Sequence, residues 1–307
     1  MSRYRRRALV LKVLLTALGV VMALAFLTPI LLTITNSFMS ETEITANYGS
    51  VFAGAADPGT DANGNPRPQT HYIAQAVHLK FIPDMVSFRQ YGTVLLRSPD
   101  YIVKFWNSVF LTVPIVVFQV AIAALAAYGF SRYRGKVREA IFFGYIVLML
   151  MPYQVTLVPN YLVARWLHLL DTRWAIILPG IFAPFSVFLL TKNMRRIPKV
   201  MIEAAELDGA GEWMIFSRVC LPLCKGALVS VAMLVFIDYW NMVEQPLILF
   251  SDTEKYPLSV FLSEINSGEV GVAFAVAVIY MTPTLLMFLW GEEYLEEGIT
   301  YAGGIKG

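Results

Sequence analysis

The chain has 307 residues, of which 57% are hydrophobic and only 15% are charged, and its mean hydropathy is +0.60. Soluble domains carry about 45–50% apolar and about 25% charged residues, so this composition excludes an ordinary soluble protein and favours lipid as the solvent. The formal net charge of +2 gives no support to a general role in binding polyanions such as nucleic acid.

Six apolar segments are long enough to cross a bilayer as helices, because a hydrocarbon core about 30 Å thick needs about 20 helical residues. They are residues 13–35, 105–130, 140–163, 174–190, 227–250 and 271–290. Arginines precede the first segment, as in a secretory signal, but the segment is too long for a signal and no small-residue cleavage site follows it. We therefore expect an all-α membrane protein with six transmembrane helices.

Lys and Arg residues gather on one side of the expected membrane. The N-terminal segment, the loops after the second and fourth helices, and the C-terminal tail together hold 16 of the 24. Cytoplasmic loops carry such an excess, which predicts that both termini are cytoplasmic. The chain would then divide into an N-terminal segment with the first helix (1–35), an extracytoplasmic loop (36–104), a five-helix core (105–290) and a cytoplasmic tail (291–307).

The expected extracytoplasmic loop differs sharply in composition from the helices. Residues 57–69 read DPGTDANGNPRPQ, which is typical of turns and has too few apolar residues to form a core. We expect an external excursion there. The three histidines, His71, His78 and His168, fall on the outer side without the spacing of metal ligands, so we interpret them as surface residues.

Polar side chains within the second and third apolar segments have two interpretations. Gln119, Gln154 and Asn160 could line a polar passage through the membrane. They could instead tie neighbouring helices together through hydrogen bonds, which are worth about 0.6 kcal/mol on average in membrane proteins. Pro152 and Pro159 predict an irregular third helix, because proline removes a backbone hydrogen bond. Such irregularity is tolerated where the backbone faces protein or a water-filled cavity.

The loop between the fourth and fifth helices, residues 197–222, reads IPKVMIEAAELDGAGEWMIFSRVCLP. Proline suits the first position of a helix, and Glu203 would then lie near the positive end of the helix dipole. Ala204 and Ala205 leave a bare patch that lets another surface approach closely. Gly209 can take the left-handed conformation that ends a helix and turns the chain.

A second short helix is expected over residues 212–218, with Trp213 and Phe216 among its apolar side chains. Leu221 and Pro222 then lead into the fifth helix, and Pro222 would fix the angle of entry. The expected product is a helix-turn-helix on the cytoplasmic face, with an apolar surface that few neighbours bury. Such a surface could bind a partner protein or rest on lipid headgroups, and the physical argument leaves both possibilities open.

An ionisable residue, Asp238, lies near the centre of the fifth apolar segment, where it costs about 2.5–3.5 kcal/mol. Asn241 and Gln245 follow at i+3 and i+7, which would place all three on one stripe of a continuous helix, with Glu244 beside it. The stripe could face a hydrophilic pathway or could tie helices together. Pro246 should bend the helix at this point.

The cytoplasmic loop carries a spaced motif made of Glu203, Ala204, Ala205, Gly209, Val219, Leu221 and Pro222. This pattern resembles the EAA signature of permease subunits of bacterial ATP-binding-cassette importers, which usually has isoleucine where this chain has Val219. In that family the loop is the coupling helix that seats in a cleft of the ATPase subunit. The resemblance therefore implies a type I importer permease fold and an ATPase-coupling role for the motif.

The likeness extends from about residue 88 to the end of the chain. AYGFSR at 127–132 is similar to the YAFAR-type end of the family's second helix, and residues 151–179 are similar to the carbohydrate-importer pattern with its LGL-x-DT outer turn. The tail is similar to that of the maltose permease's smaller subunit, which reaches between the ATPase subunits. This implies an ATPase-contacting tail made of Gly303, Gly304, Ile305, Lys306 and Gly307.

The resemblance implies a multi-pass protein of the bacterial cytoplasmic membrane that helps to import an oligosaccharide or glycoside and is not itself an enzyme. The implied partners are a second, related permease subunit, two ABC ATPase subunits and an extracytoplasmic solute-binding protein. ATP and Mg²⁺ would bind to the ATPase subunits, since the sequence has no GxxxxGK[ST] phosphate loop. We expect no cofactor or metal on this chain, because Cys220 and Cys224 alone lack the ligand count of a zinc site.

Two other functions remain as alternatives at this stage. One is an ion-coupled secondary carrier or a channel in which Asp238 takes up and releases a proton; internal inverted repeats would favour it, and none is evident in the sequence. The other is an importer of the same ATP-driven class that carries a solute other than a sugar.

Overall fold

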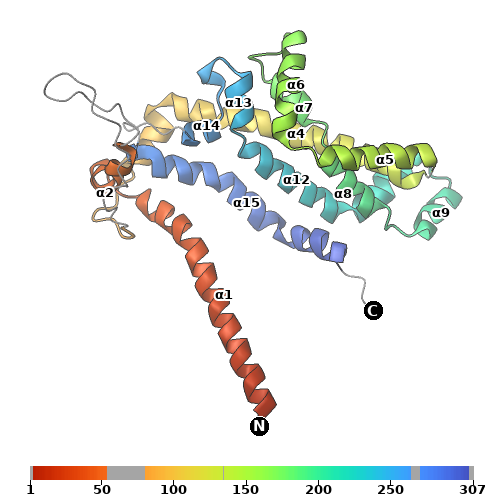
Figure 1. Cartoon of the computed structure of the whole chain (residues 1–307), viewed down its shortest axis with the longest axis horizontal. Coiled ribbons are helices and arrows are strands. Elements are labelled where there is room, and N and C mark those ends of the chain that lie inside the picture. The colour runs from red at the N-terminus through yellow and green to blue at the C-terminus, as the bar shows by residue number, and fades with distance from the viewer. Residues whose placement is uncertain (1–2, 54–79, 134, 264–269, 304–307) are drawn as a thin grey trace. The chain divides into compact units, whose positions relative to one another are not determined.

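The structure is a computed structural model, and it describes residues 3–53, 80–133, 135–263 and 270–303 (Figure 1). All regular elements within these ranges are helical. They are α1 (Arg3–Asn36), α2 (Glu41–Ala53), α3 (Arg89–Gly92), η1 (Thr93–Arg97), α4 (Pro99–Arg132), α5 (Lys136–Met149), α6 (Tyr153–Trp166), α7 (Trp174–Gly180), α8 (Pro184–Met194), α9 (Lys199–Leu207), α10 (Glu212–Ile215), η2 (Phe216–Cys220), α11 (Leu221–Leu223), α12 (Lys225–Trp240), α13 (Glu244–Leu249), η3 (Thr253–Lys255), α14 (Leu258–Ser263) and α15 (Val270–Gly303). Of the short turns, η1 and η2 are π-helical and η3 is a 3₁₀ turn.

The chain forms two compact units. The first consists of Met1–Ile102 together with Glu264–Ile279, and the second consists of Val103–Ser263 together with Tyr280–Gly307. The long helix α15 therefore contributes its first part to one unit and its remainder to the other. The second unit contains the loop at residues 197–222 and the polar pathway candidates from Gln119 to Gln245.

The described part of the first unit gathers around a small core. Met39 and Ile44 are fully buried, and the rings of Tyr48 and Phe274 meet edge to face with 5.4 Å between their centroids. The buried amide of Asn36 donates to the hydroxyl of Tyr48 over 2.7 Å. These contacts hold the end of α1, the helix α2 and the first part of α15 together.

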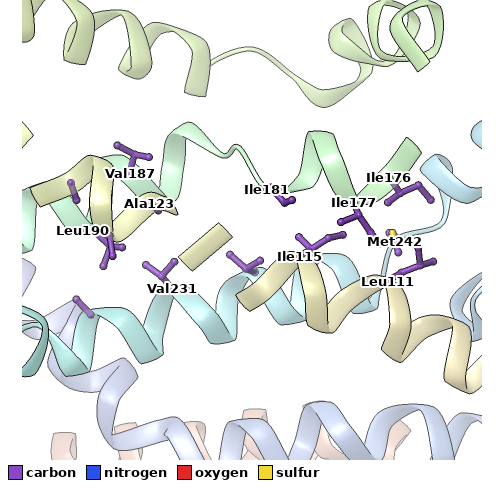
Figure 2. Close-up of a cluster of buried hydrophobic side chains, with 14 of the residues drawn as sticks. Leu111, Ile115, Ala123, Ile176, Ile177, Ile181, Val187, Leu190, Val231 and Met242 are labelled. Carbon is purple, nitrogen blue, oxygen red and sulfur yellow. The ribbon is translucent and has the colours of Figure 1, made fainter. Parts of the chain in front are cut away.

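The core of the second unit lies among α4, α7, α8 and α12 (Figure 2). Ile115 of α4, Ile177 of α7, Leu190 of α8 and Val231 of α12 are among its buried side chains. Gly180 allows α7 to approach α4 closely, because a Cβ at this position would come within 3.1 Å of the Ile115 side chain. The apolar character of these segments is thus used for packing within the chain as well as for contact with lipid.

Within the described residues, four helical stretches are long and apolar enough to cross a membrane. They are Leu11–Asn36, Pro99–Arg132, Trp174–Met194 and Gly271–Tyr294, the third of which comprises α7 and α8. They correspond to the first, second, fourth and sixth predicted segments, which confirms an all-helical membrane protein. The third predicted segment coincides with a bent pair of helices. The fifth predicted segment contains α12 and α13, and only its first part belongs to the other bent pair, Glu212–Leu223 and Lys225–Trp240.

The third predicted segment is interrupted, as its prolines indicated. The segments Lys136–Met149 and Gln154–Trp166 meet at 104°. Pro152 precedes α6 in an extended conformation, with φ −61° and ψ 142°, and it has no N–H to continue the ladder of α5. Pro159, in contrast, lies inside α6, which continues through it. Only one of the two prolines therefore breaks the helix.

The helix over residues 227–250 is interrupted, as Pro246 indicated, but the break lies before Pro246 instead of at it. α12 ends at Trp240, and α13 begins after the non-helical residue Val243. The physical reason is Pro246, whose ring would clash with the carbonyl of the residue four positions earlier, Met242, in a continuous helix. That carbonyl instead accepts a hydrogen bond from the Ser259 hydroxyl over 2.5 Å. Pro246 itself lies in the first turn of α13, where N–H groups have no partner within the helix.

Candidate functional site

The loop between the fourth and fifth predicted segments, residues 197–222, forms the predicted helix-turn-helix. α9 begins directly after Pro198, which precedes the helix with φ −58° instead of occupying its first position. No side chain of α9 is buried. Glu203 and Ala204 are exposed and Ala205 is half-buried. The motif residues on α9 are thus presented outward and are not absorbed into the core of their own chain.

The turn after α9 depends on Gly209, which has φ +81°. The N–H of Gly209 donates to the carbonyl of Glu206 over 3.0 Å, and the N–H of Ala210 donates to the carbonyl of Ala205 over 2.9 Å. This pair of hydrogen bonds is the Schellman arrangement that closes a helix with a left-handed residue. No other atom lies within 4 Å of a Cβ built on Gly209, so the glycine is required by the backbone and not by crowding.

The second helix of the loop is longer than predicted. α10, the π-helical turn η2 and α11 follow one another from Glu212 to Leu223 without a gap. The path then bends by 76° before α12, at Cys224, and not at Pro222 as expected. The π-helical turn η2 ends at Cys220, two residues before Pro222. The regular pattern of backbone hydrogen bonds is interrupted here, because proline has no N–H to donate.

The apolar surface of the loop is smaller than the sequence suggested, because part of it is buried. Ile215 and Phe216 are buried, and Leu221 packs partly against the core. Trp213 remains 70% exposed and Leu207 on α9 remains 90% exposed. We call the large apolar side chains that are exposed on α9 and α10 the loop patch. It consists of Val200, Met201, Leu207, Trp213 and Met214.

Charged side chains connect the loop to the end of α4, a contact that sequence reasoning missed. Arg132 at the end of α4 forms ion pairs with Glu206 of α9 and, at 3.5 Å, with Glu212 of α10. The hydroxyl of Tyr128 donates to the carboxylate of Glu212. The residues of α4 and of the loop are more than 70 positions apart in sequence, so no local pattern could have indicated the pairing.

The two cysteines of the loop are free and buried, as expected for small apolar positions. Cys220 lies in η2 and Cys224 marks the bend before α12.

The polar residues of the fifth predicted segment do not share one continuous helical stripe, because α12 ends first. Asp238 and Asn241 are exposed at the end of α12, Glu244 is exposed in α13, and Gln245 is half-buried. The hydroxyl of Tyr280 on α15 donates to the side-chain oxygen of Asn241 over 2.7 Å. The end of α12 is thus tied to α15, and the polar residues lie on both sides of the helix break.

The remaining candidate residues differ from one another in burial. Gln119 on α4 is buried and its amide donates to the Ser186 hydroxyl on α8 over 2.7 Å, which is a tie between helices. On α6, Gln154 is exposed and Asn160 is half-buried. Within the C-terminal tail, Gly303 is the last residue of α15, and residues 304–307 lie outside the described residues.

The outer turn, residues 167–172, is held by many hydrogen bonds. His168 and Asp171 both have positive φ, 55° and 61°. The Asp171 carboxylate accepts from the backbone N–H groups of Ser251 and Asp252, at 3.1 and 3.2 Å, and from the Lys255 ammonium at 3.0 Å. The hydrogen bond from Lys255, followed by that from the Asp252 N–H, holds the pKa of the Asp171 carboxyl below its ordinary value.

Comparisons with known proteins agree with this arrangement. The family described as "Binding-protein-dependent transport system inner membrane component" matches residues 119–300, which is more than half of the chain. An arabinooligosaccharides transport system permease protein of Halalkalibacterium halodurans is 27% identical over 78% of this chain and 87% of that protein. A lactose transport system permease protein of Rhizobium radiobacter is 27% identical over 67% of this chain and 76% of that protein.

A solved structure has the same fold. It is a chain of a bacterial ABC transporter involved in the import of the acidic polysaccharide alginate. The TM-score is 0.74 with 24% sequence identity, and the match covers 96% of this chain and 98% of that chain.

Proposed function

The chain belongs to the family of binding-protein-dependent transport system inner membrane components, and we propose that it carries an oligosaccharide or glycoside as one half of an ATP-driven importer. Membership makes it a permease subunit of a bacterial ABC importer, a multi-pass inner membrane protein and not an enzyme. The proposals below concern its topology, its partners and its substrate.

The observation that carries the proposal is the helix-turn-helix around Gly209. α9 has no buried side chain, and the loop patch exposes large apolar side chains beside it. A helix that is fully formed yet unburied by its own chain gains stability when a partner covers it. The ATPase subunit is the partner that the motif at residues 203–209 implies, and Glu203, Ala204, Ala205, Gly209, Leu221 and Pro222 are the coupling residues we propose.

We propose six transmembrane spans with both termini in the cytoplasm. The four long helical stretches give four spans, the bent pair Lys136–Met149 and Gln154–Trp166 gives another, and α12 together with α13 gives the sixth. The distribution of Lys and Arg supports a cytoplasmic location for the N-terminal segment, the loop patch and the tail. The tail, Gly303 to Gly307, is proposed to contact the ATPase subunits.

The proposed partners complete the pathway and supply its energy. A single chain with six spans gives half a pathway, so a second, related permease subunit forms the other half. Two ATPase subunits would bind ATP and Mg²⁺. The words "binding-protein-dependent" in the family description support an extracytoplasmic solute-binding protein that delivers the substrate. ATP binding closes the ATPase pair, α9 moves with it, and the two permease halves open outward.

The proposed substrate is a carbohydrate. The similar permeases are described as transporting arabinooligosaccharides and lactose, which share many hydroxyl groups. The polar residues around the break after α12 are suited to exchange hydrogen bonds with such solutes, and we propose that Asp238, Asn241, Glu244 and Gln245 line the pathway. Gln154 and Asn160 are further candidates, whereas Gln119 has a partner within the chain.

A glycine pair in the loop gives a matched test of the proposed function. Gly209→Leu forces a side chain into a left-handed conformation at a cost of about 1–2 kcal/mol, which should displace α9. Gly211→Leu is the control, because Gly211 has φ −74° and ψ 165° and open space around its Cβ. In proteoliposomes containing the complete transporter, Gly209→Leu should abolish uptake of a labelled oligosaccharide mixture while membrane insertion survives, and Gly211→Leu should transport.

Two results would contradict the proposed function. Unimpaired uptake by the Gly209→Leu variant would remove the coupling role of the loop. Uptake that continues in ATP-depleted vesicles under an imposed proton gradient would favour an ion-coupled carrier instead.

A further inference from the structure

We propose that Arg132 is a positioning residue that joins α9 to α4, so that movement of the ATPase reaches the second span through this side chain. The inference rests on the proposed function, because it concerns how the movement of α9 spreads into the permease. It adds a specific connection, between the loop and α4, to the coupling role of the loop itself.

The geometry places one guanidinium against both helices of the loop. Arg132 pairs with Glu206, three residues before the turn at Gly209, and with Glu212, three residues after it. The side chain of Arg132 is only 23% exposed, whereas those of Glu206 and Glu212 are 42% and 47% exposed. A single side chain at the end of α4 therefore bridges the two sides of the turn.

The helix dipoles explain why a cation is placed at this point. Glu206 lies in the last turn of α9, where the partial negative charge of the helix end disfavours a carboxylate. Arg132 offsets that repulsion, and it lies at the C-terminal end of α4, where a cation is favoured. Glu212 begins α10, where a carboxylate is favoured. The guanidinium also offers several N–H donors in a fixed plane, which suits it to two carboxylates at once.

An aromatic residue near Arg132 also connects α4 to the second helix of the loop. Tyr128 lies one turn before Arg132 on α4, donates to the Glu212 carboxylate, and has its ring 5.2 Å from that of the buried Phe216. α4 thus contacts α10 and η2 through both side-chain packing and a hydrogen bond. No side chain of α9 is buried, so packing cannot do the same for α9, and the pair between Arg132 and Glu206 is its described side-chain link to α4.

The proposal predicts that binding of the ATPase and transmission of its movement to α4 depend on different residues. Partly exposed ion pairs contribute little to stability, because water already solvates both charges well. Loss of Arg132 should therefore leave the loop folded and the ATPase bound, while the movement of α9 is no longer passed to α4. A residue with a purely structural role would instead lose both together.

The test uses the complete transporter in proteoliposomes and the rate of MgATP hydrolysis. The solute-binding protein is saturated with a mixture of short arabino-, galacto- and gluco-oligosaccharides, and the coupling ratio is the hydrolysis rate with this protein divided by the rate without it. Arg132→Gln should lower the coupling ratio by at least about fivefold, the lower end of typical coupling between sites. The ATPase should still co-purify in its normal amount. Arg132→Lys, which keeps the charge, should restore part of the ratio.

Two further variants isolate the pair. Adding Glu206→Gln to Arg132→Gln should cause no additional loss, because both changes remove the same interaction. Arg138→Gln is the control, since the Arg138 guanidinium lies 4.6 Å from the Tyr133 ring centroid and forms no ion pair with Glu206 or Glu212. Its coupling ratio should be unchanged.

Three outcomes would overturn the inference. They are an unchanged ratio in Arg132→Gln, a lower ratio accompanied by loss of the ATPase from the complex, and additive losses in the double variant. The Gly209→Leu variant in the same assay separates the two proposals. If the coupling ratio falls in Gly209→Leu but not in Arg132→Gln, the proposed role of Arg132 is wrong and the proposed function stands. If the coupling ratio falls in neither variant, the proposed function is wrong as well.

Discussion

The outer turn and the cytoplasmic loop both reverse the chain through left-handed residues, but they stabilise that conformation differently. The outer turn uses His168 and Asp171, which are not glycines, and it locks Asp171 with hydrogen bonds from Ser251, Asp252 and Lys255. The loop uses Gly209, and a Cβ built on this residue would meet no atom of another part of the chain within 4 Å. The first turn is stabilised by hydrogen bonds within its own chain, whereas the second follows a helix, α9, that has no buried side chain.

The largest effect should come from removing an exposed tryptophan on the cytoplasmic side. Trp213 is 70% exposed in the loop patch, and Trp166 is 77% exposed at the outer end of α6, so they form a matched pair. Truncating a tryptophan at the centre of an interface often costs more than 1 kcal/mol. We expect Trp213→Ala to weaken ATPase binding about tenfold and Trp166→Ala to leave it unchanged, as measured by titrating the ATPase onto permease in nanodiscs. Equal effects of the two changes would contradict the difference between the two regions.

The next effect should be a loss of stability at the outer turn. Asp171→Ala removes the acceptor for two backbone N–H groups and the Lys255 ammonium, and it places alanine in a left-handed conformation that it adopts poorly. We expect a lower thermal unfolding temperature for the solubilised complex. Asp208→Ala is the control, because Asp208 follows α9 on the cytoplasmic side with φ −76°. A larger loss in the control would reverse the comparison.

A smaller effect should appear on changing the pH. The pKa of Asp171 is lowered in the folded protein, so its contribution to stability is complete above its ordinary value of 3.8 and is lost as the pH falls through the lower folded value. The pKa of Lys255 is raised, so its contribution is complete below its ordinary value of 10.5 and is lost at higher pH. We therefore expect the difference in unfolding temperature between the unaltered chain and Asp171→Ala to stay constant from about pH 5 to about pH 9. A difference that declines within this window would exclude the ion pair as its source.

The smallest effect should come from His168, which is exposed and has φ 55°. His168→Gly relieves the left-handed strain, worth about 1–2 kcal/mol, but glycine also gains freedom in the unfolded chain, which offsets about 0.4–1 kcal/mol. The net stabilisation should therefore lie between about 0 and about 1.6 kcal/mol, visible as a small rise in unfolding temperature. A clear fall would show that the imidazole makes a contact that stabilises the turn.

The sequence predicted much of this architecture because hydropathy and turn chemistry act locally. The four long helical stretches follow from apolar length, and the break before α6 follows from Pro152. The turn at Gly209 was likewise predictable, since few residues other than glycine adopt its conformation. These features need no information from distant parts of the chain.

The features that were missed depend on distant contacts. The early end of α12 requires Pro246 together with Ser259, whose hydroxyl satisfies the carbonyl of Met242. The bridge between Arg132 and the loop joins residues far apart in sequence. Gln119 was an undecided candidate until its partner on α8 was known. Periodicity within one segment carries no information about such pairs.

The hydrogen bond from Ser259 to the Met242 carbonyl also has a consequence for how the chain is made. A break within a span frees backbone groups, and each one left bare in hydrocarbon costs several kcal/mol. Here the freed carbonyl is covered by a hydroxyl that is synthesised 17 residues later. We therefore expect the break after α12 to be fully stabilised only once Ser259 of α14 has been synthesised.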